Sequence, residues 1–224
     1  MERRWWIVMG MLLTLAGCAG NMGGVPGGPK PFGGKEYKIA PPRVSLSREV
    51  KVVVMLLDDE RPPMDHELDW VGQANPFGNT MGQPKEVGKE FDRAIKAGLV
   101  ACPNIRLVAP EMFLETRDAD LVISGRILRC EAEKTIGPRT VDIHGRARVE
   151  IVLRNGQGNA IGNGPLAFAK DVLVPWKSLF LNAWPDEPPP GYTASAVEKA
   201  IQQVVESFLA SKELAEVLAA WERP

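Results

Sequence analysis

The sequence predicts an α+β fold in which a largely antiparallel sheet of about five strands carries two main helices on one face. Residues 120–133 and 140–153 alternate apolar and polar side chains, which is typical of long strands with one buried face. Residues 85–101 and 195–221 repeat apolar side chains at the spacing of a helix. Because the strands are grouped instead of alternating regularly with helices, a layered α+β sandwich is favoured.

The first half of the domain supplies shorter elements. A continuous apolar run at 50–57 predicts a strand that is buried on both faces. A long loop rich in proline and glycine, at 58–84, separates this strand from the helix at 85–101. Residues 105–108 are expected to form a short strand, and residues 110–116 one helical turn.

The second half is patterned more strongly. The first long strand shifts its apolar phase after Ile127, which predicts a β-bulge. Turn-forming residues at 155–156 predict a hairpin into a further strand at 166–174. A capping box at 195–198 predicts the start of the last helix, with a kink near Ser211.

Residues 1–17 form a leader with two early arginines and an apolar run at 5–16, too short to span a bilayer permanently and typical of an export signal. The leader runs into Leu-Ala-Gly-Cys at 15–18, which resembles the lipobox of bacterial lipoproteins. The resemblance implies that the leader is removed and that Cys18 is acylated, so acyl chains hold the protein at a membrane. An ordinary signal peptide with an incidental cysteine is the alternative.

The resemblance also implies a location, and the composition of the chain indicates a domain plan. Ala19 is not the aspartate that usually retains lipoproteins in the inner membrane, so the periplasmic face of the outer membrane is expected. Residues 18–44 hold Cys18 and a tether rich in glycine and proline, with a reach of roughly 25–30 Å as a flexible coil. Residues 45–224 are then expected to form a single periplasmic domain.

Charge and hydropathy exclude two classes of protein. The full chain carries a formal charge of −1, and it carries −2 without residues 1–17, whose Glu2, Arg3 and Arg4 sum to +1. This balance lacks the basic excess of a nucleic-acid-binding surface, so no nucleic-acid partner is expected. After the leader, no apolar stretch reaches the length of a membrane-spanning helix.

Two cysteines remain besides Cys18. In an oxidising compartment, Cys102 and Cys130 could form a disulfide closing a loop of about 29 residues, which would contribute on the order of 3–4 kcal/mol. Two buried free thiols are the equally weighted alternative.

No catalytic, metal-binding or cofactor-binding pattern stands out, so we expect a protein that is not an enzyme. The carboxylates at 58–60 could hold a hard cation, but adjoining Arg61 favours a solvated or salt-bridged turn. His66 and His144 lack the spacing of zinc ligands and are expected to be exposed. The sequence also lacks the motifs of serine nucleophiles.

Aromatic side chains gather in a proline-rich loop expected at 175–193. Large rigid side chains in such loops suit recognition of a partner, because they lose little entropy on docking. The alternative is that they fold back as lids over the core. The candidates for partner binding are Trp176, Phe180, Trp184 and Tyr192.

Several features together resemble YajG-like small envelope lipoproteins: the lipobox, the D-x-R-P after the first strand, the alternating charged strand and the closing helix. The plan is also similar to the N-terminal domain of TolB and to the lipoprotein of the curli secretion channel. The resemblance marks Asp59 and Arg61, which we expect to stabilise the turn by pairing or capping. It implies a non-enzymatic role in envelope maintenance or assembly through protein–protein contacts. An auxiliary lipoprotein of an ABC-type lipid transporter is the alternative, and the oligomeric state is left open.

Overall fold

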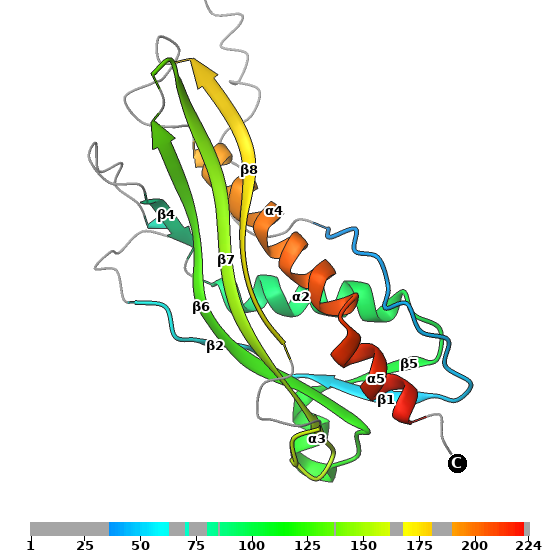
Figure 1. Cartoon of the computed structure of the whole chain (residues 1–224). Coiled ribbons are helices and arrows are strands. Elements are labelled where there is room, and N and C mark those ends of the chain that lie inside the picture. Colours follow the sequence, from blue (N-terminus) through cyan, green and yellow to red (C-terminus); the bar gives the residue numbers. More distant parts are fainter. Residues whose placement is uncertain are drawn as a thin grey trace, which may run out of the picture. The chain divides into compact units, whose positions relative to one another are not determined.

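The protein folds into an α+β arrangement with a mixed sheet (Figure 1). The chain divides between Lys30 and Pro31, and every residue described belongs to the second unit. The α+β class is confirmed, but the sheet, expected to be largely antiparallel with about five strands, is mixed and has eight strands, since three of its seven described strand pairs are parallel. The structure, a computed structural model, describes residues 36–62, 70–71, 80–84, 86–136, 138–161, 168–180 and 190–221.

The described residues form eight strands that join in one sheet, two of them only two residues long. β1 and β2 run parallel to β6, and β5 runs parallel to β1. The remaining pairs, β3 with β4, β4 with β6, β6 with β7 and β7 with β8, are antiparallel. The strands are β1 (Val50–Val54), β2 (Asp58–Asp59), β3 (Trp70–Val71), β4 (Thr80–Pro84), β5 (Ile105–Val108), β6 (Leu121–Ile136), β7 (Thr140–Asn155) and β8 (Phe168–Phe180).

Four helices complete the described fold: α2 (Val87–Val100), α3 (Pro110–Thr116), α4 (Pro190–Leu209) and α5 (Lys212–Ala220). In the described part of the chain, no helix is both long enough and apolar enough to span a membrane. α4 begins at Pro190 and not at the capping box near Ser195, because proline is well tolerated in a first helical turn. The kink predicted near Ser211 is a break between two helices, α4 and α5, where the Ser211 hydroxyl accepts a hydrogen bond from the Leu214 amide and caps α5.

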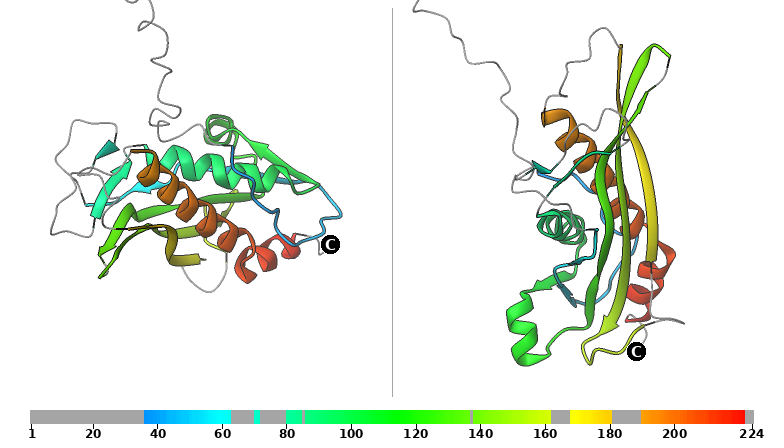
Figure 2. Two further views of the ribbon diagram at one scale, coloured as in Figure 1. Left: turned by 90° about the horizontal axis from the view of Figure 1, so that it is seen from above. Right: turned by 90° about the vertical axis from the view of Figure 1, so that its left-hand side faces the viewer.

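β1 is buried on both faces, as its apolar run predicts. Val52 and Val54 face the main core, which also contains buried side chains of α2, α4 and α5. α2 and α4 pack against each other over this core, in agreement with the expected placement of the main helices on one face (Figure 2). Val53 points the other way and packs with Phe113 of α3 and with Val122.

The long hairpin of β6 and β7 contains the predicted β-bulge. The register shifts between Ile127 and Arg129 of β6. The extra residue changes which alternate positions face inward, so Ile127 before the bulge and Cys130 and Ala132 after it are all buried in the main core.

Two predicted loops are shorter than the sequence suggests. The segment 58–84 contains β2, β3 and β4, because the long edge of β6 beyond β1 offers backbone groups for β2 and β4 to pair with. The aromatic segment 175–193 is also partly regular, since β8 continues to Phe180 and α4 begins at Pro190.

The folded domain begins before residue 45, the start that the sequence suggests. Residues 36–46, which we call the strap, include four buried side chains, and three of them, Tyr37, Ile39 and Pro42, lie in the predicted tether. The Tyr37 hydroxyl donates a hydrogen bond of 3.2 Å to Oε2 of Glu90 in α2. Burial, with a smaller contribution from the charge of Glu198, raises the pKa of Tyr37, so its hydroxyl stays protonated.

A glycine in β7 allows α4 to pack closely on the sheet. A Cβ atom at Gly145 would lie 1.7 Å from the carbonyl oxygen of Ala196, which is far inside van der Waals contact. Because the obstacle is helix backbone and not a flexible side chain, any side chain at this position must displace α4.

We therefore expect Gly145→Ala to lower the free energy of unfolding by about 1–3 kcal/mol, the usual cost of overpacking. Arg148→Ala is the matched control, since Arg148 is exposed on the opposite face of the same strand and should change stability by less than about 0.5 kcal/mol. Urea unfolding of both variants measures the difference. Equal stability would contradict the close packing of α4 on β7.

Candidate functional site

The face of the sheet that points away from α4 is polar and is the best candidate for a functional surface. Along β7 the odd positions from Ile143 to Leu153 are buried, whereas the even positions are partly or fully exposed, as the alternation predicts. We call the surface formed by the even positions, which points away from α4, the outer face. Charged side chains from the segment after β2 and from β6, β7 and β8 form ion pairs on it.

Arg126 of β6 stands at the centre of one ion-paired group on the outer face. Its Nε donates to Oε2 of Glu150 at 2.6 Å, and its Nη1 donates to Oε2 of Glu60 at 2.9 Å. The hydrogen bonds to Glu150 and then to Glu60 raise the pKa of Arg126, which therefore stays charged. The group joins β7, β6 and the segment after β2.

A second ion-paired group lies on the outer face beyond the bulge. Arg129 pairs with Glu131 and, at 2.8 Å, with Glu133. Glu133 also accepts a hydrogen bond of 3.2 Å from Arg146, which in turn pairs with Asp171 of β8 at 3.2 Å. The pairs of Arg129 lie within β6, whereas those of Arg146 link β7 to β6 and to β8, which is the role expected of cross-strand pairs.

Asp59 and Arg61 form the pair that the sequence predicts. Nε and Nη2 of Arg61 each donate to an Asp59 carboxylate oxygen at 2.7 Å, a two-pronged contact. Nη1 of Arg61 also donates to the Cys130 carbonyl oxygen at 3.2 Å, which ties the turn after β2 to β6. The Arg61 side chain is only 7% exposed, whereas that of Asp59 is 38% exposed.

Arg61→Gln should lower the free energy of unfolding by about 1–3 kcal/mol, because it removes charged hydrogen bonds from a buried position. In this variant the half-exposed carboxylate of Asp59 can be hydrated, so the loss in the free energy of unfolding is smaller than for a fully buried pair. Lys89→Gln is the control, since its pair with Glu86 is exposed on both sides and should contribute at most about 1 kcal/mol. Similar melting curves for the two variants would count against a structural role for Arg61.

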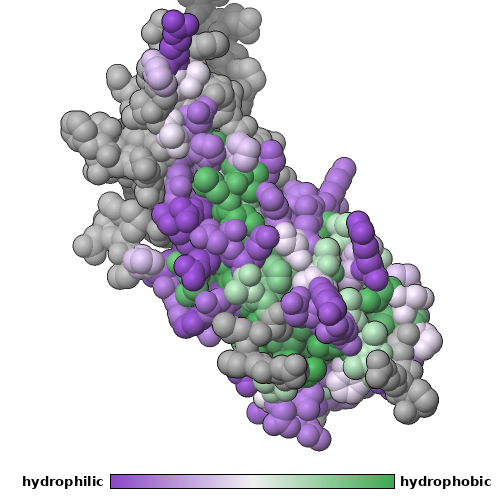
Figure 3. Space-filling model, in the orientation of Figure 1, coloured by the Kyte–Doolittle hydropathy of each residue, from purple (hydrophilic) through white to green (hydrophobic). Residues whose placement is uncertain are grey.

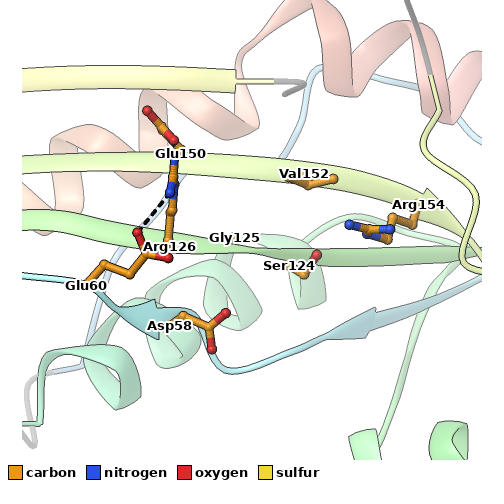
Figure 4. Close-up of a pocket in the computed structure, with 8 residues that line it drawn as sticks. All are labelled: Asp58, Glu60, Ser124, Gly125, Arg126, Glu150, Val152 and Arg154. Carbon is orange, nitrogen blue, oxygen red and sulfur yellow. Dashed lines mark hydrogen bonds and ion pairs between the residues drawn. The ribbon is translucent and has the colours of Figure 1, made fainter. Parts of the chain in front are cut away.

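A hollow of about 190 Å³ opens on the outer face beside the Arg126 group (Figure 4). Three polar side chains of the hollow take no part in the ion pairs described above, namely those of Asp58, Ser124 and Arg154. Within the described residues, the Asp58 carboxylate and the Ser124 hydroxyl have no hydrogen-bond partner, and Arg154 donates only to the Gly158 carbonyl oxygen. The hollow is lined by Asp58, Glu60, Ser124, Gly125, Arg126, Glu150, Val152 and Arg154.

Sequence reasoning finds only part of this hollow. The salt-bridged turn expected at 58–60 is confirmed for Asp59 and Glu60, which pair with Arg61 and Arg126. Ser124 and Arg154 join Asp58 only through the register of β2, β6 and β7. The polar positions of the two alternating strands were a usable signal, but a single sequence does not reveal which strands are neighbours.

Cys102 and Cys130 are both free and buried, so the structure agrees with the free-thiol alternative and not with the disulfide. Burial raises the pKa of the Cys130 thiol, and burial likewise raises that of Cys102. A raised pKa leaves little thiolate near neutral pH, and thiolate is the reactive form.

Both thiols of the folded protein should therefore react slowly with a maleimide at pH 7. Their reaction should accelerate as the pH rises, because the reactive fraction grows about tenfold for each pH unit below the pKa. Mass spectrometry after labelling, with and without denaturant, checks this. Labels on Cys102 and Cys130 that appear only in denaturant support buried free thiols, whereas no label on either until a reductant is added would show a disulfide.

His144 is half-buried, although the sequence suggests an exposed position. It lies where the pairing of β7 with β8 shifts register, opposite Pro175. Its Nδ1 is shielded from solvent and lacks a hydrogen-bond partner in the part of the chain that the structure describes.

The remaining candidates lie wholly or partly outside the described residues. Cys18, Trp184 and His66 are not described. Trp176 and Phe180 belong to β8, and Tyr192 belongs to the first turn of α4, but the description does not extend to these three side chains. The proposed aromatic recognition surface thus stays a prediction.

Exposed apolar side chains are scattered over several elements. Figure 3 shows separate hydrophobic patches among polar residues on the side that faces the viewer in Figure 1. Single exposed apolar residues are common on protein surfaces and need no special role. The large ones, 53–66% exposed, are Leu56, Val100, Met112, Leu114 and Leu173.

No protein-family model and no curated protein matches the chain. Among solved structures, it is similar to the hypothetical protein CT253 from Chlamydia trachomatis, with 14% identity over 72% of this chain and 98% of that chain and a TM-score of 0.36. A minor lipoprotein from Acinetobacter baumannii is 13% identical over 71% of this chain and 91% of that one, with a TM-score of 0.35. The PelC dodecamer from Paraburkholderia phytofirmans is 12% identical over 77% and 96%, with a TM-score of 0.33. A lipoprotein is therefore among the similar structures, but TM-scores of this size do not establish a shared activity or partner.

Proposed function

We propose that this protein is a lipid-anchored component of a bacterial cell envelope that acts by binding and not by catalysis. The observation that carries the proposal is the Leu-Ala-Gly-Cys segment at 15–18, which follows a basic and apolar leader and offers Cys18 for acylation. Two or more acyl chains give stable anchoring, at about 0.8 kcal/mol for each buried CH₂ group. The periplasmic face of the outer membrane is the proposed location, because Ala19 follows Cys18.

The strap limits how far the domain can stand from such a membrane. Tyr37 and Ile39 are fixed in the core, so only residues 19–35 separate the folded part from Cys18. At about 3.3–3.6 Å per fully extended residue, this segment spans at most roughly 60 Å. A partner would thus meet the domain within that distance of the anchoring membrane.

The arrangement of charges on the outer face favours binding as the mode of action. Arg126, Arg129 and Arg146 each pair with two carboxylates, and the pairs of Arg126 and Arg146 link neighbouring segments of the sheet, so these charges are committed to holding the fold together. The hollow beside them is lined mainly by charged side chains, whereas a carrier of acyl chains would need an apolar groove. Contacts with envelope proteins, with the aromatic residues between 175 and 193 as a second candidate surface, are the proposed role.

Cys18→Ala should release the protein from the membrane fraction, because acylation requires the Cys18 sulfur. Fractionation of cells and labelling with an alkyne-tagged fatty acid measure the change. Cys102→Ala is the control and should remain acylated, since its thiol is buried in the folded domain.

A Cys18→Ala protein that stays membrane-bound and acylated would contradict the lipoprotein proposal. The location is tested separately by Ala19→Asp. This variant should remain acylated and move from the outer to the inner membrane.

A further inference from the structure

The hollow on the outer face contains a carboxylate and a guanidinium group that do not pair with each other. Asp58 and Arg154 are exposed, and Figure 4 shows the half-buried Ser124 between them. One N–H group of Arg154 reaches the Gly158 carbonyl at 3.1 Å, which holds the side chain and leaves further donors available.

The strand register explains why Asp58 and Arg154 stay apart. Asp58 lies beside Arg126 on one side of β6, and Arg154 lies beside Val122 on the other side. Two strand spacings of about 4.8 Å and four residues of about 3.3 Å separate their Cα atoms by roughly 16 Å. Two extended side chains built from bonds of about 1.5 Å together reach about 10 Å, so a gap of several ångströms remains.

The charges around the gap favour a ligand that carries both a positive and a negative charge. The lining has three carboxylates and two guanidinium groups, and Arg126 is already paired with Glu60 and Glu150. A simple anion would match Arg154 but face the excess of carboxylates, and a simple cation would leave Arg154 unmatched. A small zwitterion would match both free charges, and Ser124 could donate to its anion or accept from its ammonium.

The size of the hollow restricts the ligand further. A volume of about 190 Å³ lies below the roughly 300–1,000 Å³ of pockets that enclose drug-sized molecules. It has room for one short polar group and not for an acyl chain or a sugar chain.

We propose that the hollow binds a small zwitterionic group, with its ammonium on Asp58 and its carboxylate or phosphate on Arg154, across Ser124. An amino acid or the free end of a short peptide has this chemistry, and so does the ethanolamine phosphate headgroup of a phospholipid. The proposal does not depend on lipidation of Cys18 or on the aromatic segment.

Calorimetric titration of the full chain in detergent tests the proposal, with glycine and phosphoethanolamine as probes. At least one zwitterion should bind, whereas ethanolamine alone and inorganic phosphate alone should bind at least about tenfold more weakly. Asp58→Asn and Arg154→Gln should each weaken zwitterion binding by at least about tenfold. Both positions are exposed, so the variants should melt like the parent chain.

Two matched control variants distinguish binding at the hollow from a general effect of the protein's charge. Glu111→Gln and Arg148→Gln remove exposed charges of the same two signs outside the hollow and should leave zwitterion binding unchanged. Binding of neither zwitterion at millimolar concentration would overturn the proposal. Equal weakening by the control variants and the hollow variants would overturn it as well.

A competition arm distinguishes the two sources of the ligand. Phosphatidylethanolamine added to the micelles should displace bound phosphoethanolamine if the site takes a lipid headgroup. Phosphatidylcholine is the control, because its trimethylated nitrogen has no N–H to donate to Asp58. Zwitterion binding that phosphatidylethanolamine does not displace assigns the site to a soluble amino acid or peptide end.

Discussion

The described fold depends on continuous pairing along β6. One edge of this strand pairs with β7 over nearly its whole length, and the other edge is shared in turn by β1, β2 and β4. Buried backbone groups must find partners, so a strand this long has to recruit several short segments to its second edge. The bulge after Ile127 keeps apolar side chains facing inward from Leu121 to Ala132, which lets one core extend beneath this part of the strand.

The two faces of the hairpin follow from this pairing. The inner face is closed by α4, which approaches β7 closely at Gly145, and by α2 packed beside α4. In the described part of the chain, the outer face of β6 and β7 carries ion pairs, and near β1 it also carries a small apolar cluster with α3. Among the described residues, Asp58 and Arg154 take part in none of the ion pairs on this face, so they are the groups that the proposed ligand would contact.

The strap connects the core to the segment that would carry a lipid anchor. Tyr37 donates to Glu90, which also pairs with Arg93, while Ile39 lies in the main core against α2 and α4. Asn104 adds a hydrogen bond of 2.6 Å to the Leu46 carbonyl at the other end of the strap. A force applied to the N-terminal segment would therefore be transmitted to side chains that are buried in the domain.

The sequence by itself determined the α+β class, both main helices, the bulge after Ile127, the break at Ser211 and the pairing of Asp59 with Arg61, because these depend on local periodicity or on near neighbours. Only the tertiary structure decided that β1 and β2 lie parallel to β6, that Tyr37 belongs to the core, and that Asp58, Ser124 and Arg154 share one hollow. Strand neighbours are chosen by packing and hydrogen bonding between segments far apart in the chain. A residue such as Tyr37, in a stretch rich in glycine and proline, shows no periodic pattern, and its burial depends on the gap between two helices that only the folded chain creates.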